Sequence, residues 1–421
     1  MFSHLSTSDD EKSMRFRVRG PNAVVNALRR AIIAHVPTAA FPFDPIAPAS
    51  SATGLAVLKN TSVIHNEMLG VRLSLVPVCA DEALTARLRQ TPDMYRFRLR
   101  KKNRSAEVVH VTTADVEVLE EGGNKAVPKA VRDALFPAGS TGDHILLTKL
   151  RPNPYDNAEG EEVHAEGVVR VKADTEGARD GQKHARWSPV SVCFFVNVVD
   201  EEAADRAFEV AEQEAIEAGE EASEEARLAR RKQFDALERL RSFLPDVFEF
   251  RLESECGLRC PFLVASGFRV LLTRVEAIRD AVEARDTTKV SFVSLSSDDV
   301  EVSAEEEEGE RERGTVNVCI ADEDHTCGNL IQGLMYERNF RGGGGGKDLE
   351  FVGYHQPHPL EREIVLRLRC SDPSANAEAV LLTNLEWVVE RLRAHLEAWV
   401  DFAGMKGAVA RKKYAMDMWG L

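Results

Sequence analysis

The stretch LLTNLEWVVERLRAHLEAWV, at residues 381–400, decides the fold of this chain. Apolar side chains recur in it at intervals of three and four residues, which predicts a helix with one narrow apolar seam. The seam consists of Leu381, Leu385, Val388, Leu392, Leu396 and Trp399. Such a seam is typical of a helix that packs against another helix, so the sequence predicts a partner helix elsewhere in the chain.

The partner helix is expected earlier in the chain, before a strongly acidic segment. Apolar residues recur there at the same helical spacing, at Phe268, Leu271, Leu272, Val275, Ile278 and Val282. Both halves of the chain share one order of elements: a strand, a helix, further strands and a long amphipathic closing helix. Because each half alone would leave an apolar stripe uncovered, we expect the closing helices to pack together as a pseudo-dimer within one chain. The residues expected in this intramolecular interface are Leu28, Phe268, Leu272, Val275, Leu385, Val388, Leu392, Leu396 and Trp399.

Size and composition indicate a folded protein with more than one domain. A chain of 421 residues exceeds what one core usually covers, and its 43% hydrophobic content rules out a wholly disordered protein. No apolar run approaches the roughly 20 residues of a membrane-spanning helix, and residues 1–14 lack the apolar core of a signal peptide. The seven cysteines are sparse and odd in number, which argues against a disulfide framework. We therefore expect a soluble protein of a reducing compartment, with no membrane partner.

The net charge of −15 is concentrated in two segments. Residues 200–225 carry a net charge of −11 and residues 298–313 carry −7, which leaves +3 for the rest of the chain. The first segment opens a proline-free region, 200–241, that is rich in Ala, Glu and Arg and predicts a solvated helix or helical hairpin between strands. The second segment has almost no apolar residues and predicts a flexible linker, which is the natural domain boundary.

These patterns predict an α+β fold in two dimerising halves, with antiparallel sheets, packed amphipathic helices and an inserted β-rich subdomain. The expected division of the chain is a disordered N-terminus at 1–14, a dimerisation domain at 15–79 and 186–296 with the acidic helical insert at 200–241, the inserted subdomain at 80–185, an acidic linker at 297–314, a smaller partner domain at 315–402 and an extension at 403–421.

Motifs of catalysis and metal binding are not found in the sequence. It has no His-Glu-x-x-His, no Gly-x-Ser-x-Gly, no DxDxD-type carboxylate cluster and no Rossmann glycine fingerprint. Cys256 and Cys260 lie close together, but no second pair completes a zinc site. We therefore expect no cofactor, no metal and no enzymatic activity. The basic residues of the extension, Lys406, Arg411, Lys412 and Lys413, are too few to indicate nucleic acid, and predict a subunit contact or a disordered end.

Several motifs in the first half resemble a known family. NALRRAIIAHVPT (26–38) and NTSVIHNEMLGVRLSLVPV (60–78) are similar to the α-like subunits of DNA-dependent RNA polymerases. That family includes the third subunit of eukaryotic polymerase II, its archaeal counterpart (the D polypeptide) and the N-terminal domain of bacterial α. The similarity continues at ILLTKLRP (145–152), KHARWSPVSVCFF (183–195) and FEFRLES (248–254).

The second half resembles the smaller partner in that family, which is the eleventh subunit of polymerase II and its archaeal counterpart (the L polypeptide). The motifs are EDHTCGNL (323–330) and GYHQPHPLEREIVLRL (353–368). One chain with both partners resembles the fused polymerase subunits of some large DNA viruses. The resemblance implies the dimerisation fold of the α N-terminal domain in each half. It also implies an intracellular location at the site of transcription, in a nucleus or a cytoplasmic viral factory, with packaging in the virion as a further expectation.

The resemblance implies a non-catalytic assembly platform. The expected partners are the largest and second-largest polymerase subunits and small polymerase subunits, with little or no direct contact to nucleic acid. From the residues alone, neighbouring arginines on a helix are usually solvated, but the motif favours a carboxylate partner, because a guanidinium group pairs with carboxylates in a planar fork. The residues expected at the subunit interface are Arg29, Arg30, Asn60, Thr61, Glu67 and Arg72.

A further group of residues is expected to be structural: Trp187, His325, Gly328, Asn329, His358 and Pro359. Asp324 or Thr326 can cap a helix that begins beside this motif. Relatives often carry a metal-binding cysteine cluster in the inserted subdomain; residues 80–183 have no cysteine, so we expect that site to be lost. Two alternatives stay open: an autonomous homodimeric interaction protein outside transcription, and an enzyme that uses Cys256 and Cys260 or His325.

Overall fold

The computed structural model describes residues 1–44, 54–120, 125–153, 155, 160–172, 185–294, 315–342, 346–359 and 361–420. The linker expected at 297–314 lies outside the described residues. Within them, no helix combines the length and the apolar character needed to cross a membrane.

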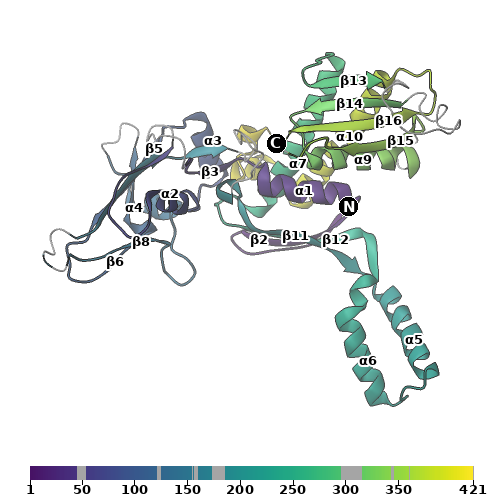
Figure 1. The fold of residues 1–421 in the computed structure, drawn as a ribbon, viewed down its shortest axis with the longest axis horizontal. Coiled ribbons are helices and arrows are strands. Elements are labelled where there is room, and N and C mark those ends of the chain that lie inside the picture. Colours follow the sequence, from purple (N-terminus) through teal and green to yellow (C-terminus); the bar gives the residue numbers. More distant parts are fainter. Residues whose placement is uncertain are drawn as a thin grey trace.

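The first half is a four-stranded antiparallel sheet with helices on one face (Figure 1). Along β2, buried and exposed residues alternate, and Met14, Phe16 and Val18 face the helices. The sheet has the order β1–β2–β12–β11, and the elements are β1 (Phe2–Thr7), β2 (Ser13–Arg19), α1 (Asn22–Ala34), β11 (Val190–Val199), β12 (Phe243–Ser254) and α7 (Cys260–Glu283).

Residues 1–14 are ordered, so the expectation of a disordered N-terminus is wrong. β1 pairs with β2, and the ring of Phe2 packs against the rings of Phe16, Phe268 and Trp399. The Phe2 side chain therefore packs β1 against the shared core. The polar composition of the segment concealed that contact.

The second half repeats the arrangement of a sheet with helices on one face. Its sheet has the order β13–β14–β16–β15, from β13 (Val290–Ser294), β14 (Thr315–Ala321), β15 (Leu349–His355) and β16 (Glu363–Cys370), with the helices α9 (His325–Phe340) and α10 (Ala377–Phe402). The edge strand β13 precedes the expected linker. The second half therefore begins between α7 and β13, not after residue 296, because the residues of β13 pair with β14.

One core spans both halves, which we call together the dimerisation body. Buried residues of α1, α7, β2 and β12 form a single apolar cluster with buried residues of α9, α10, β14 and β16. The long helices α7 and α10 pack side by side, and α1 packs against both α7 and α9. The predicted α+β fold, with antiparallel sheets and packed amphipathic helices, is confirmed.

The inserted domain runs from β3 to η3 and has a core of its own. Phe41, Leu55, Leu69 and Leu73 pack in this core with Phe97, so the domain begins near residue 38 and not at residue 80. The apolar pattern of residues 38–79 predicted burial, but it did not show which core they join.

The main sheet of the inserted domain has the order β4–β9–β5–β7, and two further pairs are β3 with β10 and β6 with β8. Its elements are β3 (Thr38–Ala40), β4 (Leu55–Asn60), α2 (Asn66–Ser74), α3 (Glu82–Gln90), β5 (Tyr95–Lys102), β6 (Val109–Thr112), η1 (Thr113–Asp115), β7 (Val116–Glu120), α4 (Lys129–Leu135), β8 (Leu146–Leu150), β9 (Glu162–Val168), β10 (Arg170–Lys172) and η3 (Ala185–Trp187).

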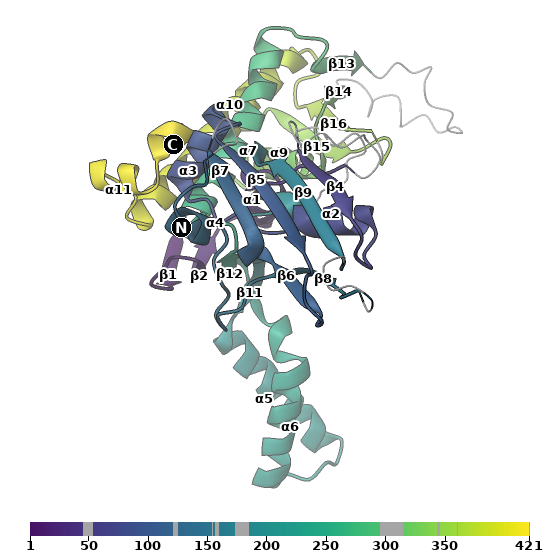
Figure 2. The same ribbon diagram turned by 90° about the vertical axis from the view of Figure 1, so that its left-hand side faces the viewer.

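The acidic insert at 200–241 forms a helical hairpin, the arm, between β11 and β12. Its elements are α5 (Glu201–Glu217), α6 (Glu224–Leu237) and η4 (Arg239–Arg241). The arm projects away from the sheet, on the side opposite to α1 and α7 (Figures 1 and 2). The rings of Phe208 and Phe234 meet 5.5 Å apart, and Arg230 on α6 pairs with Glu212 on α5. Ion pairs between its helices therefore neutralise part of the charge that the sequence concentrates here.

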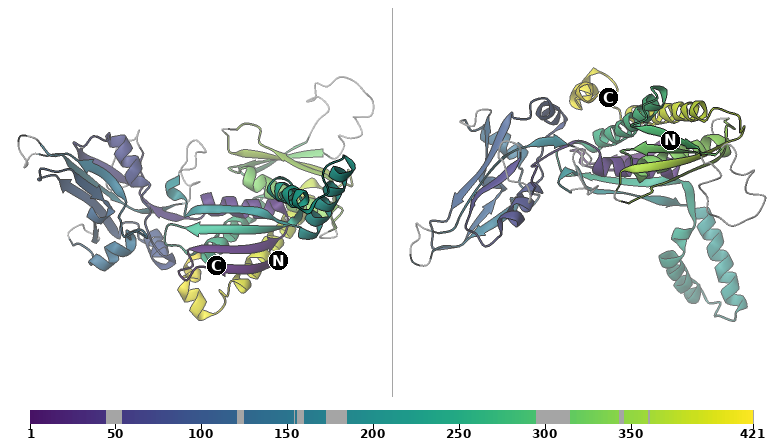
Figure 3. Two further views of the ribbon diagram at one scale, coloured as in Figure 1. Left: turned by 90° about the horizontal axis from the view of Figure 1, so that it is seen from below. Right: turned by 45° about the horizontal axis from the view of Figure 1, so that its top comes forward.

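The extension is folded and lies against the dimerisation body. After α10, the chain turns back into two short helices, α11 (Ala408–Lys413) and α12 (Met416–Trp419), drawn in yellow beside α7 (Figure 3). Met405, Tyr414 and Met416 are buried in the shared core. Of the two interpretations of this segment, a disordered end is therefore wrong.

Candidate subunit-interface site

The two halves meet in an apolar interface between α7 and α10. All nine residues expected there, from Leu28 to Trp399, are buried in the shared core. Trp399 is fully buried, and its indole Nε1 donates a hydrogen bond to the carbonyl oxygen of Pro261, 2.9 Å away. Its ring also packs against Phe16, with centroids 4.7 Å apart. A buried tryptophan whose N–H is satisfied is an anchor of such an interface.

A second contact between the halves joins α1 to α9. The guanidinium Nε of Arg30 donates to the hydroxyl of Thr326 over 2.7 Å. α9 begins at His325 because the Asp324 carboxylate caps it and accepts hydrogen bonds from the N–H groups of Thr326 and Cys327. Arg30 therefore contacts the second half of its own chain, and its place on an external docking face stays a prediction.

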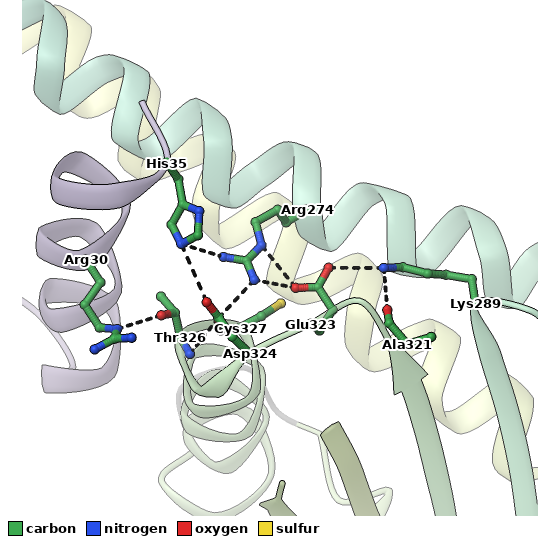
Figure 4. A network of polar contacts seen from close by, with 9 residues as sticks. All are labelled: Arg30, His35, Arg274, Lys289, Ala321, Glu323, Asp324, Thr326 and Cys327. Atoms are coloured by element: carbon green, nitrogen blue, oxygen red, sulfur yellow. Dashed lines mark hydrogen bonds and ion pairs between the residues drawn. The ribbon is translucent and has the colours of Figure 1, made fainter. Parts of the chain in front are cut away.

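Arg274 on α7 is the centre of a polar network between the halves (Figure 4). Its guanidinium donates to Glu323 (Nε to Oε2, 3.1 Å) and to Asp324 (Nη2 to Oδ1, 3.0 Å), both in the second half. His35, just after α1, places its Nε2 3.3 Å from Nη1 of Arg274 and 3.6 Å from Oδ2 of Asp324. Lys289 approaches Glu323 from the other side, with Nζ 3.5 Å from Oε1. Charges from both halves thus meet in one largely buried cluster.

The network holds Asp324 in its charged form. Burial raises the pKa of this carboxyl, but the contact with His35 and the charge of Arg274 outweigh burial and bring the pKa well below its usual range. Desolvation of two buried charges offsets most of the energy of their attraction, so such a pair adds little net stability. Breaking it is costly, because one charge then stays buried without a partner. The network therefore joins Glu323 and Asp324 of the second half to Arg274 of the first.

Arg29 lies on the outer side of α1 and does not reach the second half. Its Nε and Nη2 both donate to the side-chain oxygen of Asn26, at 3.1 and 3.0 Å. Asn22, Asn26, Arg29 and Ile33 share the helix face that turns away from the core. A guanidinium held at its Nε edge by Asn26 keeps further N–H donors for another carboxylate.

The remaining residues expected at the subunit interface lie together in the inserted domain, on α2 and in the loop before it. The Asn60 side chain donates to the carbonyl oxygen of Ile64 and accepts from Ser62, which closes the loop before the helix. Thr61 exchanges hydrogen bonds with the backbone of β9, and Arg72 donates to the carbonyl oxygen of Leu146 over 2.7 Å. Glu67 is exposed. The side chains of Asn60, Thr61 and Arg72 therefore hold α2 in place.

An exposed apolar surface along α2 was not predicted. Met68 is 64% exposed and Val71 and Leu75 follow on the same side of the helix, while Leu69 and Leu73 face the core. Val63, in the preceding loop, is 69% exposed, and Leu58 on β4 is also exposed. The signal in the sequence was that residues 68–76 are apolar on both faces of one short helix. The described chain covers only one of these faces, and the other is exposed.

The residues expected to be structural occupy the following places. Trp187 is buried in η3, where the chain leaves the inserted domain, and the His325 ring packs edge-on against the Tyr354 ring. A Cβ on Gly328 would overlap the Tyr354 ring, so only glycine permits this approach of α9 to β15. Asn329 is half-buried on α9. The carbonyl oxygen of His358, next to Pro359, accepts from the Glu361 N–H in the turn before β16.

The cysteines offer no reactive thiolate. All seven are free, and burial raises the pKa of Cys193, Cys256 and Cys260 to about 12, so these thiols stay protonated near neutral pH. Across the described ranges, no three His, Cys, Asp or Glu side chains are grouped so that they could hold a metal ion.

Two halves of similar architecture, joined through paired helices and one core, define an intramolecular dimerisation protein. Residues 315–397 match the RNA polymerase Rpb3/Rpb11 dimerisation domain. The chain is 31% identical over 90 residues to DNA-directed RNA polymerase subunit Rpo11 of Saccharolobus islandicus, which covers 21% of this chain and 84% of that protein. It therefore belongs to the Rpb3/Rpb11 family of RNA polymerase subunits.

Other relatives match the first half of the chain. The human DNA-directed RNA polymerases I and III subunit RPAC1 is 28% identical over 204 residues, 44% of this chain and 51% of that protein. The Rpo3 polymerase subunit of Natronomonas pharaonis is 46% identical over 70 residues, 16% of this chain and 24% of that protein. The chain thus spans about half the length of the human relative. The resemblance to α-like polymerase subunits is confirmed.

Proposed function

We propose that this chain is a non-catalytic assembly subunit of a DNA-dependent RNA polymerase, in which both α-like partners are fused and dimerise within one polypeptide. The observation that carries the proposal is the single apolar core shared by the two halves, closed by α7 and α10. A platform of this kind needs no catalytic group of its own. It needs a rigid body and exposed surfaces that other subunits cover.

Two surfaces have the character of docking sites for the second-largest and largest subunits. The outer face of α1 presents Arg29, held in place by Asn26. The surface along α2 presents Met68, Val71 and Leu75 beside Val63. Apolar side chains exposed as a group mark protein contacts, and an exposed guanidinium on the other surface can pair with a carboxylate. Small polymerase subunits are further expected partners.

Fusion of the partners has a physical advantage. A short flexible connection keeps two binding surfaces at an effective concentration on the order of millimolar, which enforces one-to-one pairing. Here the halves are joined by the short segment between Glu283, at the end of α7, and Val290, at the start of β13, so the tether spans a short distance. Action at the site of transcription follows from this role. Because the two partners are fused, we still expect the source to be a large DNA virus. The expected location of the protein is then a nucleus, a viral factory or the virion.

Co-expression with the two largest subunits of the same polymerase tests the docking role. Arg29→Glu places a carboxylate on the docking face without touching the shared core, and we expect it to reduce co-purification of the second-largest subunit at least tenfold. Arg104→Glu, at an exposed loop position of the inserted domain, is the matched control. Full co-purification of the Arg29→Glu variant would remove Arg29 from the docking face. If the unaltered chain retains neither large subunit, the alternative is a homodimeric interaction protein, which light scattering would detect.

A further inference from the structure

The folded extension, residues 403–420, contacts both the dimerisation body and the inserted domain; we call it the strap. It leaves the second half at the end of α10 and turns back at Gly404 and Gly407, which have positive φ angles of 67° and 101°. Met405, Tyr414, Ala415 and Met416 are buried. A segment that buries four side chains on its own chain is not free to serve as a flexible tail.

The first contact of the strap is with the dimerisation body. The Tyr414 hydroxyl donates to the Glu11 carboxylate over 3.0 Å, and Nζ of Lys413 pairs with the same carboxylate at 2.8 Å. The guanidinium of Arg259, just before α7, lies over the Tyr414 ring at 5.7 Å. The strap is therefore anchored at the turn between β1 and β2 and at the start of α7.

The second contact is with the inserted domain. Trp419 packs edge-on against Phe262 of α7, with ring centroids 5.2 Å apart, while its indole Nε1 donates to the carbonyl oxygen of Glu82 over 3.2 Å. Glu82 is the first residue of α3 in the inserted domain. One side chain of the strap thus contacts the two domains together.

The same place is the junction of the two domains. The Glu82 side chain is 1% exposed, and its Oε1 accepts the backbone N–H of Arg259 at 2.9 Å. Gly257, at a φ of +88°, has no room for a Cβ, because Ala80 and Cys79 lie against it. Cys79 in turn places its Sγ 3.6 Å from the carbonyl oxygen of Glu255.

The chain also crosses twice between the two domains, once after α1 and once before β11. Domains joined by such crossings and a modest interface move unless other contacts hold them.

We propose that the strap fixes the orientation of the inserted domain on the dimerisation body. Because it is attached to α10, the strap reaches the junction when the second half is docked on the first. Docking of the halves therefore also sets the position of the α2 surface relative to Arg29. The fixed orientation stands on the contacts alone, while its value for docking large subunits rests on the proposed function.

Hydrogen exchange and small-angle scattering of the isolated full chain test the proposal. In the variant Tyr414→Ala with Trp419→Ala, we expect amide exchange at the start of α3 and at residues 255–262 to accelerate at least tenfold. We also expect a larger maximum dimension by scattering, while exchange in β12 and β16 stays as in the unaltered chain. Val409→Ala with Met418→Ala changes two exposed side chains of the strap, 85% and 47% exposed, and is expected to change neither measurement.

A conservative variant covers the case in which the double variant does not fold. Trp419→Phe keeps a ring against Phe262 but removes the N–H donor to Glu82, so faster exchange is expected at the start of α3 alone. Exchange and scattering that match the unaltered chain in a folded double variant, or unchanged exchange in Trp419→Phe, would overturn the proposal. Both measurements use the chain without other subunits, so their failure is distinct from a failure to bind polymerase.

Discussion

At the scale of single residues, the contacts between the halves depend on partners far apart in the chain. Arg30 and Thr326 are separated by 296 positions, and Arg274 and Glu323 by 49. The motif around residues 26–38 indicated that its arginines were important, but it did not distinguish them. In the structure, Arg30 bonds to Thr326 in the second half, whereas Arg29 bonds to Asn26 on its own helix.

Removal of Arg274 is the sharpest test of the polar network. Arg274→Ala leaves Glu323, whose side chain is 5% exposed, without its main cation, and we expect a loss of about 3–5 kcal/mol in the free energy of unfolding. Arg285→Ala breaks the exposed pair with Glu378 and is expected to cost less than about 1 kcal/mol. Urea unfolding of the purified chain measures both. Equal losses would show that the buried network has no special role.

The pH dependence of stability should reflect Asp324. Its pKa is lower in the folded chain than in the unfolded one, so its contribution is complete above about pH 4–5 and is lost as the pH falls below that range. Asp324→Asn keeps a residue that caps α9 well but removes the charge. We expect the variant to be less stable at pH 7 and to lose less stability between pH 5 and pH 3 than the unaltered chain. Parallel curves for the two proteins would contradict this.

At the scale of elements, α10 and α7 depend on each other, because neither has the single apolar stripe of an ordinary surface helix covered by its own half alone. Each carries an apolar side that the other covers, and Trp399 closes the end of the contact. The seam of α10 was predicted because its spacing is local. The sequence placed the residues of β13 in the first half, because the pattern along one strand does not show which strand pairs with it. Its pairing with β14 places β13 in the second half.

Deletion of residues 315–421 should therefore expose the apolar side of α7 in the remaining fragment. We expect a chain of residues 1–296 to aggregate or to form oligomers through α7, because an exposed apolar stripe of this length is not tolerated in a monomer. Addition of residues 315–421 as a separate chain should restore a soluble one-to-one complex, in which β13 of the fragment pairs with β14. Size-exclusion chromatography with light scattering measures both states. A monodisperse monomer of the fragment would contradict the shared core.

In Trp399→Ala, the loss of a fully buried ring and its hydrogen bond should cost about 3–5 kcal/mol of unfolding free energy. Trp387→Ala, on the same helix but only half-buried, is the control and should cost clearly less. Thermal unfolding followed by circular dichroism measures the difference. Similar losses in the two variants would show that α10 is not anchored at Trp399.

At the scale of the whole molecule, the chain is a central body with an inserted domain at one end and the arm projecting from its sheet (Figures 1 and 2). The arm makes its main contacts within itself, through Phe208, Phe234 and ion pairs such as Arg231 with Asp205. It leaves and re-enters the sheet at Val199 and Phe243, which are paired across β11 and β12. The sheet of the dimerisation body is therefore complete without the arm.

Replacement of residues 200–242 by a two-residue Asn-Gly turn should leave the body folded. Val199 and Phe243 already face each other as a hairpin end, so a tight turn can join them. We expect the free energy of unfolding to change by less than about 1 kcal/mol, while the net charge becomes less negative. Calorimetry of both proteins measures this. A large loss of stability would show that the arm supports the sheet.

The sequence by itself determined the elements whose signal is local: the helical seams, the acidic insert as a helical segment, a helix cap at Asp324 or Thr326 and the motifs of the polymerase family. These depend on spacing along the chain, which is visible in one dimension. The tertiary structure alone decided which core each apolar segment joins, that Arg30 turns inward and Arg29 outward, and that the strap meets Glu82. Apolar burial has no direction and does not specify a partner, so only the packed chain shows where each surface is covered.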